Sequence, residues 1–494
     1  MSNNVRYLSE IERYEIININ DGEKYSGLIN NDVIIDEEGK LKYLIVNLGG
    51  GKFNLFNSDE YLEIEWENVK RIGAKTIILD VDSDMIKKLS CRSVGILKIV
   101  VQKFGGTSVS TKERRTMVVE KVKGAINKGY LPVVVVSAMG RKGEPYATDT
   151  LLGLVSEEFK KENKLATDLL MGCGEIISTV VMSDELREAE IEAVPLTGGN
   201  AGILTDDNYS SADFIDINPK LILEVLKEGK VPVVAGFQGV DRNGFLTTLG
   251  RGGSDTTAAV LGVALKAEEI EIYTDVDGIM TADPRIVGDA ELINKISYNE
   301  VFQLADQGAK VIHPRAVEIA MKGNVTLVIK NTMSTCIGTM IDSLGDVDNN
   351  KFITGITHQG NRIQVSIKSD DNKDNINYKT ILESLANNKI SLDLINIFPK
   401  EKVFTIDAGV KELFEDIMRK NHLKYSLVED LSTIAIVGSR MRGIPGVMAK
   451  IVGALDQENI EVLQTADSHM TIWCLVESKN VKEAIKALHR AFMK

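Results

Sequence analysis

The chain has 494 residues, with 71 acidic and 58 basic side chains and a net charge of −13. This length exceeds what one hydrophobic core supports, so two to four domains are expected. The negative charge argues against binding to nucleic acid or to anionic membranes, because both require a surplus of Lys and Arg. The four cysteines are scattered without a CxxC pair, which disfavours a metal cage or a disulfide framework. Apolar runs are only strand-length and no secretory signal is visible, so a cytoplasmic protein is expected.

Residues 1–90 predict a small all-β domain. In "YLEIEW" the hydrophobic side chains of Leu62, Ile64 and Trp66 alternate with glutamates, which is the period of a half-buried strand. Turn signals at Asp21-Gly22 and Glu38-Gly39 separate further short strands. The spacing is typical of a barrel or a sandwich.

Residues 96–335 predict a three-layer α/β domain. The segments "LKIVVQKF", "YLPVVVVSAM", "KVPVVAGFQGV", "AEEIEIYTDV" and "VTLVIK" are near-continuous apolar runs, as in strands covered on both faces. Helical patterns such as "RRTMVVEKVKGAINKG" and "SDTTAAVLGVALKA" lie between them. The polar stretch "DSLGDVDNNK" that follows is interpreted as a linker.

The C-terminal part contains an internal repeat with a period of 70 residues. The hydrophobic positions of "TILESLANNKISLDLI" recur in "KIVGALDQENIEVLQT", and each copy combines an amphipathic helix, a polar turn and a strand. We expect two α+β modules of the βαββαβ, ferredoxin-like type, at 351–428 and 429–494.

Lys103 ends a buried strand and is followed by Gly105-Gly106, although the chain has no P-loop. Such glycines allow backbone N–H groups to approach a phosphate, and the lysine supplies a point charge for a transferring phosphoryl group. Two more glycine-bearing turns, "GRGGSD" at 250–255 and "TDVDGI" at 274–279, and Lys310 in "GAKVIHP" belong to the same domain. Each signal alone is weak, but together they indicate a phosphoryl-transfer site.

The motifs "KFGGTS", "VVVVSAMG", "CGEIIST", "GRGGSD", "TDVDGIMTADPR" and "GAKVIHPRA" occur in this order. They resemble the aspartate kinase family of the amino-acid kinase fold, in which paired ACT regulatory domains follow the kinase domain. The spacer "SAMGRKGEPYATDTLL" is most similar to Gram-positive, diaminopimelate-sensitive aspartokinases. The resemblance covers residues 98–494. Outside it, the N-terminal region resembles a PRC-barrel domain with an interaction or spacer role.

This resemblance implies ATP-dependent phosphorylation of the L-aspartate side-chain carboxylate, the first step towards lysine, diaminopimelate, threonine and methionine. It further implies ATP with Mg²⁺ bound through the nucleotide, feedback through the ACT modules, and a homodimer or higher homo-oligomer. One alternative is another carboxylate kinase of this fold, such as glutamate 5-kinase, and Arg251 together with the ACT pair argues against it. A second alternative is a non-catalytic amino-acid sensor, against which the intact set of Lys103, Asp255 and Lys310 argues.

The resemblance also assigns roles to individual residues. Lys103 would stabilise the developing charge, and Asp255 would orient the lysines and phosphates rather than act as a base. Arg251 would bind the substrate α-carboxylate and Glu175 the ammonium group. The phosphate loop would comprise Gly105, Gly106, Thr107 and Ser108. The remaining aspartate-pocket residues would be Ser137, Thr148, Gly252, Gly253 and Ser254. The nucleotide contacts would be Thr274, Asp275, Gly278, Arg285 and Lys310.

Most of these residues also have a purely structural interpretation. Glu175 could be a carboxylate at a helix N-terminus, Ser137 a helix cap, and Asp275 a turn residue at a strand end. Arg285 could belong to a surface turn. The position of His313 directly before a proline favours a structural role for this histidine over a catalytic one. Met280 stands where many family members have Tyr, which makes adenine contacts less certain than phosphate contacts.

The loop "RMRGIPGVMAK" of the second module is the candidate effector site. Gly443 and Gly446 would allow close backbone approach, Pro445 would fix the turn, and the following helix N-terminus would attract a carboxylate. The corresponding segment of the first module, "THQGNRIQVSIKSDDN", lacks such a loop. The resemblance points to meso-diaminopimelate as the inhibitor, with lysine as the alternative.

Overall fold

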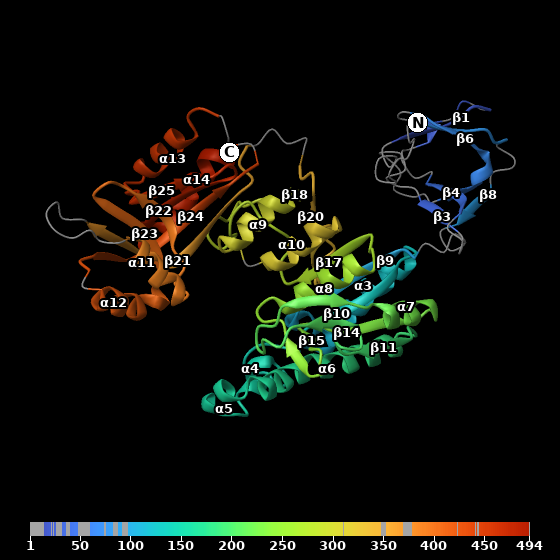
Figure 1. Cartoon of the computed structure of the whole chain (residues 1–494), viewed down its shortest axis with the longest axis horizontal. Helices are drawn as coiled ribbons and strands as arrows, with labels where there is room; N and C mark the ends of the chain where they lie inside the picture. The colour runs from blue at the N-terminus through green and yellow to red at the C-terminus, as the bar shows by residue number, and fades with distance from the viewer. Residues whose placement is uncertain are drawn as a thin grey trace, which may run out of the picture. The chain divides into compact units, whose positions relative to one another are not determined.

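The computed structural model describes residues 14–20, 22, 24–25, 32–35, 40–47, 60–73, 76–82, 87–90, 97–309, 311–346, 352–368, 378–421, 423–439, 441 and 444–493. The chain divides into two compact units, Met1–Lys98 and Ile99–Lys494 (Figure 1). Two predicted site residues, Lys310 and Gly443, lie outside the described residues.

The N-terminal unit is a small β domain made of two four-stranded sheets, ordered β2-β1-β7-β6 and β3-β4-β5-β8. Side chains of both sheets enclose one hydrophobic core, in which Leu62 and Ile64 are buried as their alternation predicts. The elements are β1 (Glu15–Asn18), β2 (Lys24–Tyr25), β3 (Asp32–Ile35), β4 (Leu41–Asn47), β5 (Glu60–Glu65), the 3₁₀ turn η2 (Trp66–Asn68), β6 (Val69–Ile72), β7 (Thr76–Leu79) and β8 (Lys87–Ser90).

The second unit begins with an eight-stranded sheet, ordered β11-β14-β10-β9-β17-β19-β20-β18. The first six strands in this order run parallel, and β20 is antiparallel to β19. Their bounds are β9 (Ile99–Phe104), β10 (Leu131–Val136), β11 (Ala193–Leu196), β14 (Val231–Ala235), β17 (Glu269–Thr274), β18 (Lys295–Ser297), β19 (Thr326–Asn331) and β20 (Thr339–Asp342). Five of these strands are the apolar runs identified in the sequence.

Helices cover both faces of this sheet, which confirms the predicted three-layer α/β class. Phe104 and Tyr273 face a core shared with α3 and α6, whereas Ile270 on the opposite face meets α8. The helices are α2 (Gly106–Val109), α3 (Lys112–Asn127), α4 (Thr148–Leu152), α5 (Glu157–Glu162), α6 (Lys164–Glu188), α7 (Lys220–Lys227), α8 (Gly253–Ala264), α9 (Tyr298–Asp306) and α10 (Pro314–Gly323). Among the described helices, α6 alone is long and apolar enough to cross a membrane, and half of its most apolar window is buried within the protein, as in a core helix.

A separate four-stranded sheet, ordered β13-β12-β15-β16, lies within the same domain. Its strands are β12 (Ile203–Thr205), β13 (Phe214–Ile217), β15 (Gln238–Val240) and β16 (Leu246–Thr248). Strand β16 leads directly into the glycine-bearing turn at 250–255. This small sheet therefore positions the turn relative to α8.

The C-terminal segment forms one six-stranded sheet, ordered β22-β23-β21-β24-β26-β25, with helices packed on it (Figure 1). Its elements are β21 (Gly355–Lys368), α11 (Tyr378–Asn387), β22 (Asp393–Ile397), β23 (Glu401–Asp407), η4 (Ala408–Val410), α12 (Lys411–Lys420), β24 (Ser426–Val437), α13 (Val447–Asp456), β25 (Gln464–Asp467), β26 (Thr471–Glu477), η5 (Ser478–Asn480) and α14 (Val481–Met493).

Two hydrophobic cores divide this sheet into two modules. One contains Ile363 and Leu385 with α11 and α12, and the other contains Ile451 and Leu455 with α13 and α14. Ile356, at the start of β21, belongs to the second core although it precedes the first module in the chain. The long antiparallel strands β21 and β24 therefore each serve both modules. The inner module is inserted into an outer module whose first strand comes from before the insertion.

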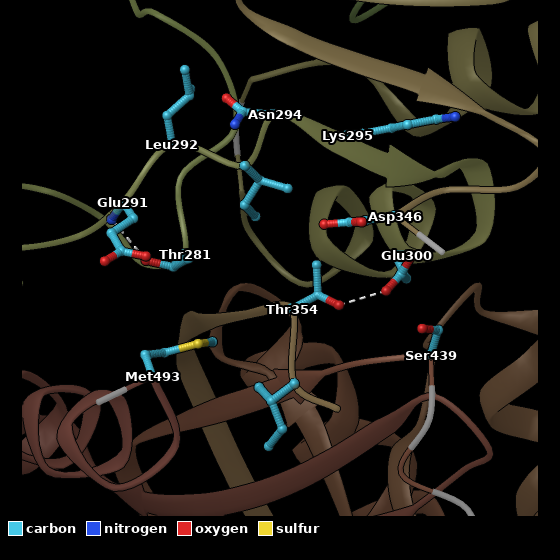
Figure 2. Close-up of a pocket in the computed structure, with 12 residues that line it drawn as sticks. Thr281, Glu291, Leu292, Asn294, Lys295, Glu300, Asp346, Thr354, Ser439 and Met493 are labelled. Atoms are coloured by element: carbon cyan, nitrogen blue, oxygen red, sulfur yellow. Dashed lines mark hydrogen bonds between the residues drawn. The ribbon is translucent and has the colours of Figure 1, made fainter. Parts of the chain in front are cut away.

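The outer module contacts the three-layer α/β domain directly. Thr281 accepts a backbone hydrogen bond from Ile356 (2.8 Å), and its hydroxyl lies 3.0 Å from Nε2 of His489 on α14. Thr354 donates to the buried carboxylate of Glu300 beside a cavity of about 210 Å³, which Figure 2 shows between the two parts. Ala282 even belongs to the hydrophobic core of the outer module. The outer module and the three-layer α/β domain therefore share one packed junction.

Candidate active site

The predicted site residues gather at the carboxyl edge of the central strands. Lys103 lies at the end of β9, Ser137 follows β10 and Thr274 ends β17. These three strands are adjacent and in register, with Lys103 opposite Val135 and Ile272. Ligands of open α/β sheets bind at this edge, because loops diverge there and leave a crevice.

Lys103 and Asp255 form an ion pair at this edge, with 2.7 Å between Nζ and Oδ1. Their side chains are only 12% and 14% exposed, so the pair is largely shielded from water. Asp255 lies in the first turn of α8, and its Oδ2 accepts a long hydrogen bond of 3.4 Å from the backbone N–H of His313. The lysine charge is thereby held beside the turn that follows β9.

Close packing requires a glycine at position 106, whereas position 105 has room for a Cβ. A Cβ on Gly106 would lie 2.5 Å from the carbonyl oxygen of Ala138, and one on Gly105 would lie 3.7 Å from Lys103 Nζ. Thr107 and Ser108 lie in the short helix α2, and the Ser108 hydroxyl is buried against Thr332 Oγ1 at 2.7 Å. The segment that follows the lysine is therefore held by packing against Ala138 and Thr332.

The second glycine-bearing turn brings the N-terminus of α8 to the same place. Gly252 has a φ of 71°, and a Cβ there would clash with the ring of His313. Helix α8 then begins at Gly253, and Ser254 accepts a 3.0 Å hydrogen bond from Ser137. His313 thus packs on the turn, and burial lowers the pKa of its imidazole.

Glu175 is a buried carboxylate in the middle of α6, so the interpretation as a helix N-terminal residue is wrong. One oxygen accepts a 3.1 Å hydrogen bond from the backbone N–H of Ala138. The other oxygen has no hydrogen-bond partner among the described residues, although it is shielded from solvent. Burial raises the pKa of Glu175 to about 8. Burial therefore favours the neutral form of this carboxyl as long as no cation lies beside it.

Two other predicted substrate contacts lie nearby but are less enclosed. Arg251 is exposed at the tip of the turn between Gly250 and Gly252. Thr148 is half-buried and is the first residue of α4, which packs on α6.

Of the predicted nucleotide contacts, Asp275 and Arg285 are exposed, Thr274 is half-buried and Gly278 is buried. Thr274 and Asp275 end β17, and Gly278 has a φ of 157°, where a Cβ would meet Thr339 Oγ1 at 2.5 Å. Arg285 is exposed and forms an ion pair with Asp283 at 2.7 Å, as the surface-turn interpretation also allows. Asp275 pairs with Arg141.

Arg141 was not identified from the sequence. Its Nη2 lies 2.8 Å from Asp275 Oδ2, and its Nε donates to Thr107 Oγ1 at 3.1 Å. With Arg114 it lines a cavity of about 300 Å³ at the phosphate loop. The sequence did offer one signal for this residue, because Arg141 directly follows Gly140 in the loop after β10. Basic residues next to glycines are common in surface loops, so this signal is not specific.

Three segments match known domain families. Residues 98–331 match the amino acid kinase family, residues 426–490 an ACT domain, and residues 3–86 a PRC-barrel domain. The fold and the lysine–carboxylate site therefore define a kinase of the amino acid kinase class with an attached regulatory segment.

Relatives over most of the chain narrow this class. Aspartokinase 1 of Bacillus subtilis is 43% identical over 401 residues, covering 80% of this chain and 99% of that protein. The aspartokinase of Bacillus sp. (strain MGA3) is 38% identical, covering 80% and 97%. The structure of E. coli aspartokinase III in complex with aspartate and ADP superimposes with a TM-score of 0.66 at 25% identity, covering 80% and 100%. The chain belongs to the aspartokinase family and is a kinase of that type.

Proposed function

We propose that the protein transfers the γ-phosphoryl group of ATP to the side-chain carboxylate of L-aspartate, giving ADP and 4-phospho-L-aspartate. The observation that supports this most directly is Glu175, whose buried Oε2 has no partner among the described residues. An α-ammonium group would supply the missing counter-charge and stabilise the ionised carboxylate. An amino-acid substrate therefore suits this pocket better than a simple carboxylic acid.

Arg251 would complete recognition of the amino acid by binding its α-carboxylate. A guanidinium matches a carboxylate through two parallel hydrogen bonds, and its exposure leaves it accessible to the ligand. Ser137 and Ser254, linked at 3.0 Å, would contact the side-chain carboxylate of aspartate. These contacts would direct that carboxylate towards the phosphate loop.

The chemical step requires charge stabilisation rather than a base. A carboxylate oxygen of the substrate attacks the γ-phosphorus and the bond to the ADP oxygen breaks, so no proton is removed. Lys103 would stabilise the negative charge on the transferring group, and Asp255 would hold the lysine in place. The rigid turn at Gly105 and Gly106 would bring backbone N–H groups to the phosphates.

The nucleotide would lie along the ends of β9 and β17, contacted by Thr274, Asp275, Arg285 and Lys310. Mg²⁺ bound through the nucleotide would neutralise part of the phosphate charge. Among the described residues, no group of three or more His, Cys, Asp or Glu side chains could hold a metal ion. A metal carried by the nucleotide fits this donor set, because Asp255 and Asp275 are already paired with Lys103 and Arg141.

The regulatory part would bind an end product, meso-diaminopimelate or alternatively lysine, near Pro445 and Gly446. Gly446 has a φ of 89° and open space around its Cα, and α13 begins at the next residue. The ten-residue α13 would direct its N-terminal N–H groups at a ligand carboxylate. A homodimer formed through the ACT modules is consistent with exposed Ile397 and Phe398 at the edge strand β22.

A coupled assay for ADP release tests the proposal. Aspartate should support ADP release, and glutamate should support far less, because its longer side chain places the carboxylate differently from the lysine. Glu175→Gln should raise the KM for aspartate much more than that for ATP. Equal activity with glutamate would indicate another carboxylate kinase, and no ADP release with either would indicate an amino-acid sensor.

A further inference from the structure

The segment that carries Arg251 has little intrinsic rigidity. Gly250 and Gly252 flank the arginine with φ values of 70° and 71°, a conformation that glycine permits but does not enforce. The guanidinium itself is exposed. Its position therefore depends on how firmly the preceding residues, Thr248 and Leu249, are held.

Asp168 anchors this segment through hydrogen bonds to Thr248. It lies on α6, is completely buried, and accepts hydrogen bonds from Thr248 N (2.7 Å) and Thr248 Oγ1 (3.0 Å). The same carboxylate accepts from Ser210 N (2.9 Å) and Ser210 Oγ (3.2 Å). Four donors to one carboxylate form a strong set of charge-assisted bonds. Ser210 has a φ of 73°, which is uncommon outside glycine, so these bonds also maintain an unfavourable backbone.

A second link joins the same two segments from the other side. Arg315 on α10 donates to the carbonyl of Leu249 at 3.4 Å and pairs with Asp213 at 2.7 Å. The backbone N–H of Ala212 donates to Thr248 O at 2.8 Å. The turn around residues 210–213 and the end of β16 are therefore fixed to each other and to α6.

We propose that Asp168 is a positioning residue for substrate recognition, because it fixes Thr248 and Ser210 so that Arg251 is presented to the α-carboxylate of the amino acid. Asp168 acts through this segment and does not itself touch the substrate. The inference rests on the proposed function, in which Arg251 binds that carboxylate. It assigns a role to a buried acid that the catalytic step does not use.

Thr248→Val tests the role with the least risk to folding, because it removes one hydroxyl bond and keeps the side-chain shape. Thr247→Val is the matched control, since Thr247 is equally buried on the same strand but bonds Thr205 at 2.6 Å. Thr248→Val should raise the KM for aspartate about fivefold while kcat and the KM for ATP stay within about twofold. Thr247→Val should not separate the two KM values.

The decisive measurement is a double-mutant cycle with Arg251→Ala. If Thr248 and Asp168 act through Arg251, the effect of Thr248→Val on kcat/KM for aspartate should largely disappear in the Arg251→Ala background. A persisting, additive effect would overturn the positioning role while leaving the proposed function intact. An Arg251→Ala variant with an unchanged KM for aspartate would instead refute the carboxylate contact in the proposed function, and the route through Arg251 with it.

Asp168→Asn extends the test, because it removes the negative charge and leaves one acceptor oxygen where the carboxylate offers two. A larger rise in the KM for aspartate is expected, about tenfold or more, again without a matching rise for ATP. If this variant does not fold, Thr248→Val and Ser210→Ala supply the same comparison. Parallel increases in both KM values, in any of these variants, would show a merely structural role.

Discussion

At the scale of single residues, the site depends on a few ionisable side chains held away from water. Lys103 pairs with Asp255 at 2.7 Å, and Glu175 is buried with one oxygen bonded to Ala138 N. In such surroundings a fixed charge interacts more strongly with a ligand than it would in water. Changes to these side chains should therefore affect turnover and binding in separable ways.

We expect Lys103→Met to lower kcat by about 10² to 10³, because it removes the charge directed at the transferring phosphoryl group. Steady-state kinetics with circular dichroism as a folding check would measure this. Lys112→Met, which removes an exposed lysine paired with Glu188, is the control and should keep kcat. Turnover within a few-fold of the parent for Lys103→Met would contradict the catalytic role.

Glu175 should make aspartate binding pH-dependent. Its pKa is raised to about 8 by burial, so the free enzyme holds this carboxyl mostly neutral below that pH. Binding of an ammonium group requires the ionised form, so the KM for aspartate should fall as the pH rises from about 6 towards 8 and then level off. Glu175→Gln should abolish this dependence. A profile shared by both proteins would refute the assignment.

The same raised pKa has a consequence for stability. Because the folded-state pKa lies above the ordinary value of 4.5, the folded protein holds the proton more tightly than the unfolded chain. The stabilising contribution is fully present below the unfolded pKa and is lost as the pH rises through about 8. The melting temperature of the parent should therefore fall as the pH rises through about 8, and that of Glu175→Gln should lack this fall. Thermal unfolding of both proteins over this pH range would test this.

At the scale of elements, the proposed site lies where strands end and helices begin. Strand β9 ends at Phe104, one residue after the lysine, and α8 begins within the turn that contains Arg251 and Asp255. The same arrangement recurs in the regulatory part, where Gly446 precedes α13. A glycine with positive φ permits each of these tight transitions into a helix.

Gly446→Asp should weaken feedback inhibition and leave the uninhibited kcat intact, because the new charge repels a ligand carboxylate. The φ of 89° strains any L residue, so Gly446→Asn is the matched control for strain without charge. Inhibition curves with meso-diaminopimelate and with lysine would compare the three proteins. Unchanged inhibition in the Asp variant would contradict the effector site, and so would an Asn variant that loses inhibition equally.

At the scale of the whole molecule, the regulatory part and the catalytic part share a junction. Thr281 bonds Ile356 and His489, and Ala282 packs into the outer regulatory core only a few residues before Arg285. A change in the outer module can therefore bias the segment that we propose contacts the nucleotide. An effector acts only through such differential contacts between two conformations.

A chain that begins at Val94 should fold and keep kinase activity. The N-terminal barrel encloses its own core, the chain divides near Lys98, and every proposed site residue follows Ile99. Activity per mole and the melting temperature of the shortened and full-length proteins would test this. Insoluble protein or lost activity would show that the barrel supports the kinase domain.

The sequence by itself determined the elements and the class of chemistry. The period-two alternation of Leu62 and Ile64, the apolar runs of the central strands, and the glycines after Lys103 are local signals that neighbouring residues fully specify. The resemblance of the ordered motifs added the family and the set of candidate residues. The structure contains these predicted features, because burial and backbone geometry depend on residues only a few positions apart.

Only the tertiary structure decided which distant residues meet. The sharing of β21 and β24 between two modules depends on pairing of residues 60 to 82 positions apart, and no local pattern encodes such a pairing. The repeat of 70 residues predicted two consecutive modules, whereas packing placed Ile356 in the core of the second. Asp168 showed no sequence signal of its own, because its role depends on four donors from two remote turns. Long-range contacts are selected by packing of the whole chain, which is why the sequence predicted the parts and the fold determined their partners.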